Sequence, residues 1–177
     1  SATATQDEFS PVPSSSAAET TRRISEPPDN AETTQKSRAL EILASIADRA
    51  LEMGRIEDAE DLLKTTLLDM AQESSLGHEL EAESLEFTVR YALRLAHANG
   101  SGRWFDFTVD LLRGQRAPCT ASVASDLRAT MKRVTAVDVG RLSAYSRTLR
   151  ESGHVTAAQS ATVVDELIQE ASRKRGA

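Results

Sequence analysis

Cysteine and long apolar runs are scarce in this chain, and each absence excludes a class of protein. One cysteine among 177 residues leaves no partner for an intrachain disulfide, so a disulfide-stabilised secreted scaffold is excluded. No apolar run approaches the roughly 20 residues that span a bilayer, and the N-terminus lacks the basic and apolar blocks of a secretory signal. We therefore predict a cytoplasmic protein without a membrane partner.

Aromatic residues, glycine and proline are also few, and the residues that remain favour helix. Aromatic residues make up 4% of the chain, whereas Ala, Leu, Glu and Arg dominate after Lys36. These four residue types are strong helix formers. A chain of 177 residues is about one domain long and can bury a core, so an all-α domain is expected.

The formal net charge of −6 is unevenly distributed along the chain. Residues 1–37 carry −3, residues 38–113 carry −7 and residues 114–177 carry +4. The basic part holds only two lysines, and Tyr145 is its one aromatic residue, so we expect no nucleic-acid partner. The acidic part favours a basic protein partner instead.

Residues 1–37 differ in composition from the rest of the chain. They hold four of the five prolines, many Ser, Thr and Ala residues, and few bulky apolar ones. Such a segment cannot bury enough apolar surface to offset its chain entropy, so we predict a disordered linker over 1–37 and a folded domain over 38–177. Because the chain begins at serine, we also expect a further domain upstream.

Apolar residues at spacings of three and four predict about seven helices after the linker. The first stripe comprises Leu40, Leu43, Ile46, Ala47, Ala50 and Leu51. The expected helices are 38–53, 56–73, 80–98, 103–113 and 120–134, then one that Asp138 caps and that runs to Gly153, and one from Thr156. We therefore expect an all-α bundle of helical hairpins.

Three glycines mark the expected bends. Gly54, Gly102 and Gly153 are each followed, two residues later, by an apolar residue. Glycine closes a helix at positive φ, and the apolar residue then begins the buried stripe of the next helix. The intervals of 48 and 51 residues between these glycines predict an irregular bundle, since a regular array repeats one interval.

The first hairpin resembles a tetratricopeptide repeat. The residues at that family's large, small and packing positions are Leu43, Ile46, Ala47, Ala50, Gly54, Ile56, Ala59 and Leu63. The small residues among them let two antiparallel helices approach closely. The resemblance implies a groove between stacked hairpins that binds a peptide or a helix of a partner protein.

A second resemblance covers residues 38–177. A Ser/Thr/Pro-rich segment precedes LEILASIADRALEMGRIEDAEDLL and YALRLAHANGSGRWFDFTVDLL, an order similar to the helical regions that follow forkhead-associated (FHA) phosphothreonine-binding domains in bacterial signalling proteins. The chain itself contains no FHA domain. The resemblance implies the C-terminal part of a larger protein, a scaffold or adaptor in bacterial signalling or secretion that acts with a Ser/Thr kinase.

Four residues of the predicted linker are candidate phosphorylation sites. Two arginines precede Ser25 in the arrangement that a basophilic kinase selects. Thr21 has an isoleucine at the third following position, which FHA domains commonly read. Thr33 and Thr34, after a glutamate, are further candidates. The alternative function is therefore a regulatory phosphoprotein whose linker is phosphorylated and then bound by a phosphothreonine-binding domain.

Trp104, Phe105 and Phe107 bring three of the seven aromatic residues into one short stretch. In a chain with so few aromatic residues they predict the centre of the core. The alternative is an exposed anchor for a partner peptide.

No arrangement of residues indicates catalysis, a metal site or a cofactor. The three histidines, His78, His97 and His154, lie far apart and do not have the spacing of zinc ligands with Cys119. No serine lies in a nucleophile-elbow motif, and carboxylate pairs such as Glu57 with Asp61 are expected on solvent faces. We therefore predict a non-catalytic protein-protein interaction module.

Overall fold

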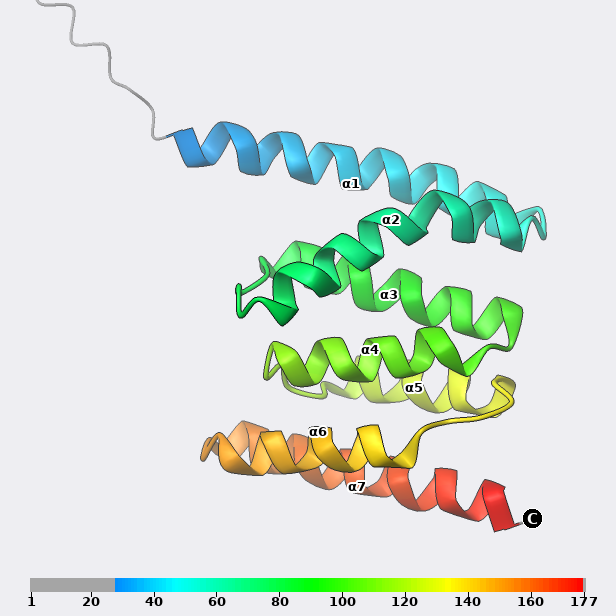
Figure 1. The fold of residues 1–177 in the computed structure, drawn as a ribbon, viewed down its shortest axis with the longest axis vertical. Coiled ribbons are helices and arrows are strands. Elements are labelled where there is room, and N and C mark those ends of the chain that lie inside the picture. Colours follow the sequence, from blue (N-terminus) through cyan, green and yellow to red (C-terminus); the bar gives the residue numbers. More distant parts are fainter. Residues whose placement is uncertain (1–27, 177) are drawn as a thin grey trace, which may run out of the picture.

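The computed structural model describes residues 28–176, which form seven helices and no strand (Figure 1). These helices are α1 (Pro28–Glu52), α2 (Ile56–Ser75), α3 (Ala82–Asn99), α4 (Gly102–Gly114), α5 (Ala121–Arg133), α6 (Val139–Glu151) and α7 (Val155–Gly176). The predicted all-α fold is confirmed. Residues 1–27 and 177, and with them the candidate sites Thr21 and Ser25, lie outside the described residues.

The helices stack in two layers (Figure 1). Neighbouring helices of one layer are α1, α3, α5 and α7, and those of the other are α2, α4 and α6. Three hairpins build the stack, namely α1 with α2, α3 with α4, and α6 with α7. Helix α5 packs on α3, α4 and α7 but not on α6, so it is inserted between the second and third hairpins.

Helix α1 begins ten residues earlier than the sequence predicts, so the boundary of the linker at residue 37 is wrong. Pro28 is its first residue, a position where the missing N–H of proline has no helical partner to lose. Residues 31–35 are all exposed and bury no apolar stripe. The stripe that predicts the rest of α1 is therefore absent from this part of the helix.

Polar contacts attach the early part of α1 to the rest of the stack. Lys36 forms an ion pair with Glu73 of α2, with 3.8 Å between Nζ and Oε2. The hydroxyl of Ser37 donates to Oε2 of Glu83 in α3 at 2.6 Å. These contacts join residues far apart in the sequence, and periodicity does not show them.

Two of the three predicted glycine bends are confirmed. Gly54 and Gly153 end α1 and α6 with φ of 72° and 70°. The prediction is wrong for Gly102, because Gly100 ends α3 instead, with φ of 69° and its N–H bonded to the carbonyl of Ala96. Gly102 is the first residue of α4.

Gly102 lies where two segments of the backbone approach each other closely. A Cβ atom at this position would lie 2.0 Å from the carbonyl oxygen of Ala136, in the loop that joins α5 to α6. The N–H of Thr135 in the same loop donates to the carbonyl of Gly100 at 3.1 Å. The start of α4 thus touches the α5–α6 loop at a distance that leaves room for no side chain.

The aromatic cluster lies in the core, as the first of its two interpretations predicts. Trp104 and Phe105 are only 1% and 0% exposed, whereas Phe107 is half-buried. The indole N–H of Trp104 donates to Oε1 of Glu60 at 2.9 Å, and the ring of Phe107 meets the indole edge-on at 5.2 Å. The alternative prediction of an exposed partner anchor is therefore wrong for Trp104 and Phe105, because both side chains are buried where α4 packs against its neighbouring helices.

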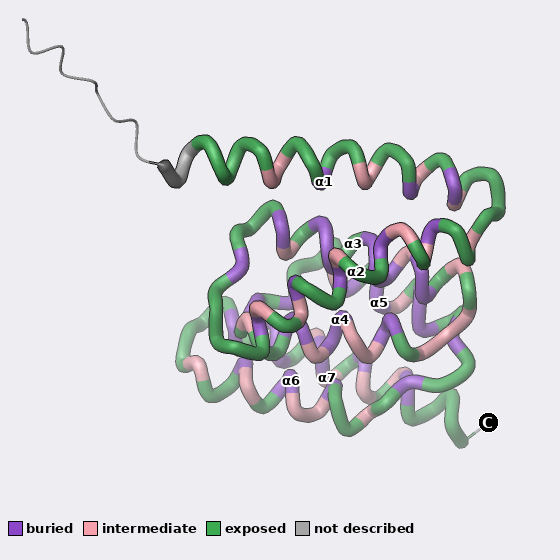
Figure 2. Tube along the Cα trace, turned by 45° about the horizontal axis from the view of Figure 1, so that its top comes forward, coloured by how far each residue is buried: buried purple, intermediate pink, exposed green. Residues whose placement is uncertain are grey.

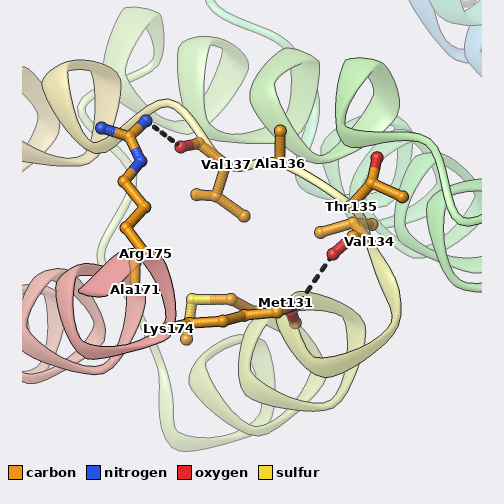
Figure 3. A pocket seen from close by; sticks show the side chains of 8 residues that line it. All are labelled: Met131, Val134, Thr135, Ala136, Val137, Ala171, Lys174 and Arg175. Carbon is orange, nitrogen blue, oxygen red and sulfur yellow. Dashed lines mark hydrogen bonds between the residues drawn. The ribbon is translucent and has the colours of Figure 1, made fainter. Parts of the chain in front are cut away.

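The basic end of α7 closes the stack around the α5–α6 loop (Figure 3). Lys174 donates from Nζ to the carbonyls of Met131 and Val134 at 2.9 and 2.7 Å, and Arg175 donates from Nη2 to the carbonyl of Val137 at 2.7 Å. The last carbonyls of a helix lack partners within it, and cations favour that end of the helix dipole. Lys174 thus caps α5, not its own helix.

Replacing Lys174 with methionine is expected to lower the free energy of unfolding by about 1–2 kcal/mol, because the carbonyls at the end of α5 lose their charged donor. Urea denaturation followed by circular dichroism measures the loss. The matched control is Arg173→Met, which removes the same charge from an exposed residue next to it. Equal losses in both variants would show a general charge effect and no cap.

Candidate peptide-binding groove

Helix α3 lies between α1 and α5, and three hollows adjoin along it. The hollow between α1 and α3 has a volume of about 270 Å³. Two hollows between α3 and α5 have volumes of about 310 and 400 Å³. Arg90 lines all three, so they are neighbours, and together they are here named the α3 groove.

The largest hollow of the α3 groove lies where α3, the end of α4 and the start of α5 meet. Apolar residues of its lining include Leu85, Val89, Leu112, Pro118 and Val123. Its rim is polar and carries Glu86, Arg90 and Asp126. An apolar floor with a few charged groups at the rim is the usual make-up of a site that takes one side chain of a ligand.

The hollow between α1 and α3 has an aromatic floor. The rings of Phe87 and Tyr91 lie 4.7 Å apart, centroid to centroid. The hydroxyl of Tyr91 donates to Oδ1 of Asp48 at 2.7 Å, and Arg94 forms an ion pair with the same carboxylate. Burial first, and then the bond to Asp48, raise the pKa of Tyr91 to about 12. The phenol therefore stays neutral and holds α1 against α3.

Negative charge exceeds positive charge around the α3 groove. Its lining contains four carboxylates, those of Glu41, Glu83, Glu86 and Asp126, against the guanidinium groups of Arg90 and Arg94. Arg90 pairs with Glu86 at 2.6 Å. Within residues 28–176, neither Glu41 nor Asp126 has an ion-pair partner, so these two remain able to bind a cation.

Among the described residues, no group of three or more His, Cys, Asp or Glu side chains could hold a metal ion. Cys119 lies just before α5, where a helix N-terminus could lower its pKa, but burial instead raises the pKa of this thiol to about 11. It is 4% exposed. In the described part of the chain, no helix is both long and apolar enough to cross a membrane.

The structure separates the other predicted site residues from the groove. Thr33 lies in α1 and donates from its hydroxyl to Oε1 of Glu81 at 3.4 Å, and Thr34 follows it on the same helix. Both therefore belong to a helix, where the sequence predicts a linker. Phosphate on Thr33 would meet the carboxylate of Glu81 and weaken the attachment of α1, because the two groups repel each other.

Sequence reasoning missed the α3 groove because its residues had other interpretations. Leu85 and Val89 belong to the predicted buried stripe of their helix, and Val89 is buried. Glu79 and Glu83 form another carboxylate pair at four-residue spacing, of the kind expected on solvent faces. The signal that could have indicated the groove is an apolar face of α3 that lies next to a charged face of the same helix.

Comparison with known proteins finds no family model, no curated protein and no solved structure that matches this chain. The tetratricopeptide-like and FHA-associated resemblances therefore stay predictions. The case for a function rests on the geometry of the groove.

Proposed function

We propose that this chain is a non-catalytic protein-protein interaction module whose α3 groove binds a short peptide or helix of a partner. The observation that supports the proposal is the hollow of about 400 Å³ with an apolar floor, bordered by a carboxylate that has no ion-pair partner in residues 28–176. The ligand that fits is a segment with a bulky apolar residue next to lysine or arginine.

Each part of such a ligand has a counterpart in the groove. A leucine or phenylalanine side chain fits the floor formed by Leu85 and Val123. A lysine or arginine one helical turn away reaches Asp126 on one side or Glu41 on the other. Burial of the apolar side chain supplies most of the affinity, and the rim charges select basic segments and speed association.

The wider role that goes with this proposal is that of a scaffold or adaptor in bacterial signalling or secretion, C-terminal to an FHA domain. It rests on the resemblance of residues 38–177. The phosphoprotein alternative rests on Thr21 and Ser25, which lie outside the described residues, and on Thr33 and Thr34 in α1.

Selection of a displayed library of random peptides on the full chain tests the groove. Enriched peptides are expected to carry an apolar residue beside lysine or arginine. A synthetic copy of the best peptide, measured by fluorescence anisotropy, is expected to bind about tenfold more weakly to Val123→Glu and to Asp126→Lys. Added salt weakens the binding further, because the rim charges are exposed.

Val155→Glu is the matched control for Val123→Glu, since Val155 is an exposed valine at the start of α7 and lines none of the three hollows. It should leave peptide binding unchanged. Enrichment of acidic peptides, or equal binding by all these variants, would contradict the proposed function. Circular dichroism of each variant separates lost binding from lost fold.

A further inference from the structure

Helix α1 has a second apolar stripe, on a face that nothing in the described structure covers. Ile42 and Ile46 of α1 are 56% and 52% exposed, and Met53, the residue just after the helix, is 54% exposed. Ile46 belongs to the stripe that the sequence predicts as buried, so that prediction is wrong for this residue. Figure 2 shows α1 along one end of the stack, with exposed residues over most of its length. An exposed apolar stripe of this kind marks an interaction surface.

The spacing of this stripe is that of a coiled-coil seam. Its positions follow one another at alternating intervals of four and three residues and are Gln35, Ala39, Ile42, Ile46, Arg49 and Met53, here named the α1 seam. Every one of them is exposed. The buried stripe, on an adjacent face of α1 with Leu40 and Ala47, packs on α2 and α3. Helix α1 therefore has two apolar faces, of which the stack uses one.

The other end of the stack has no such stripe. The exposed positions along the middle of α7 are polar and include Gln159, Thr162, Glu166 and Gln169. Stacked helical arrays need a polar outer face on each terminal helix to stay apart in water. Helix α7 meets this requirement, whereas the α1 end does not.

The charges that flank the α1 seam are complementary to those of a second, antiparallel copy of the seam. In the heptad that the seam defines, the flanking g positions are Arg38, Ser45 and Glu52, all exposed. Neither Arg38 nor Glu52 forms an ion pair with any other residue of 28–176. In an antiparallel pair centred on Ser45, Arg38 of each copy faces Glu52 of the other. The series of positive, neutral and negative side chains is therefore complementary to the same series read in the opposite direction.

The same antiparallel register pairs the apolar residues. Ile42 of one copy meets Ile46 of the other twice, at the centre of the contact. The long side chain of Arg49 lies opposite the small side chain of Ala39, which leaves room for it. A two-fold axis requires that each contact occur in both directions, and this register satisfies that rule at every layer of the seam.

We propose that the α1 seam binds a second copy of this chain, as an antiparallel α1–α1 pair that forms a homodimer. The occupant follows from the charge pattern, since the seam carries its own complement. None of the seam residues lines the α3 groove, which uses Leu40, Glu41 and Ala44 of the same helix. Dimerisation therefore presents two grooves at once, and it stands or falls independently of what the grooves bind.

Sedimentation equilibrium of the full chain tests the dimer. The chain is expected to associate to a dimer at micromolar concentrations, and Ile42→Glu or Ile46→Glu to weaken the dimer more than about 100-fold, because each buries an unpaired charge. The matched control is Val155→Glu, an apolar-to-acidic change at the polar end of the stack, which should leave the dimer unchanged.

A charge exchange tests the antiparallel register. Arg38→Glu and Glu52→Arg are each expected to weaken the dimer about tenfold, and the double variant to restore it, because the exchanged charges again face each other. A chain that stays monomeric, as it would if residues 1–27 or a different protein covered the seam, overturns the proposal. So does a dimer that neither isoleucine variant weakens, and so does a double variant weaker than both single ones.

Discussion

Gly102→Ala is expected to lower the free energy of unfolding by more than about 3 kcal/mol, or to abolish folding, because the new methyl group has no space. Its Cβ would lie 2.0 Å from the carbonyl oxygen of Ala136. That atom belongs to a loop fixed by Thr135 on one side and by Arg175 on the other. The backbone must move apart, which breaks these hydrogen bonds. Thermal and urea denaturation measure the loss.

Gly140→Ala provides the control for Gly102→Ala. Gly140 also lies in the first turn of a helix, but the nearest atom to its Cβ is the side-chain oxygen of Asp138, at 3.0 Å. This side chain adjusts, so the change in stability is expected to stay within about 1 kcal/mol, helped by the better helix propensity of alanine. Equal losses at Gly102 and Gly140 would show that the close approach to Ala136 does not exist in solution.

Trp104→Ala is expected to cost about 3–5 kcal/mol of stability, because it empties the centre of the core. Trp104 is one of the largest fully buried side chains of the described residues. The variant also removes the indole N–H that donates a hydrogen bond to Glu60 of α2. Trp104→Phe, which keeps most of the apolar volume, is expected to lose less than half as much. Trp104 is the one tryptophan of the chain, so the variant has no tryptophan fluorescence to follow. Unfolding is therefore measured by circular dichroism.

Phe107→Ala serves as the reference for Trp104→Ala. Phe107 is the next aromatic residue of α4 and packs on the indole, but it is only half-buried. Truncating Phe107 should cost clearly less stability than truncating Trp104, because the side chain of Phe107 buries less apolar area on folding. If Phe107→Ala proved the more damaging of the two, α4 would have to face the other way, with Trp104 toward solvent.

The sequence predicts the helices after residue 38 well, because their burial is periodic. Leu63 and Leu67, for example, repeat on one face of α2 and are fully buried. Helix ends marked by Gly54, Gly153 and Asp138 are also found, since their chemistry is local. The first turns of α1 are not predicted, because contacts such as Ser37 with Glu83 hold them and no apolar stripe does.

The candidate site could not be predicted in the same way. Glu41, Glu86 and Asp126 come from three helices, and only the stacking of α1, α3 and α5 brings them around one groove. Periodicity also assigns one buried face to each helix. It therefore placed Ile46 in the core with Ala47, although the two residues lie on different faces of α1.

The carbonyls at the end of α5 receive their partners from the last residues of the described chain. Met131, Val134 and Val137 accept hydrogen bonds from Lys174 and Arg175, about forty positions later in the sequence. During synthesis the N-terminal hairpins emerge first and begin to fold first. The carbonyls at the end of α5 and in the loop after it therefore lack these donors until the end of α7 has left the ribosome. The native stack is therefore completed by its final turn, and a chain that stops before Lys174 lacks the residues that fasten the α5–α6 loop.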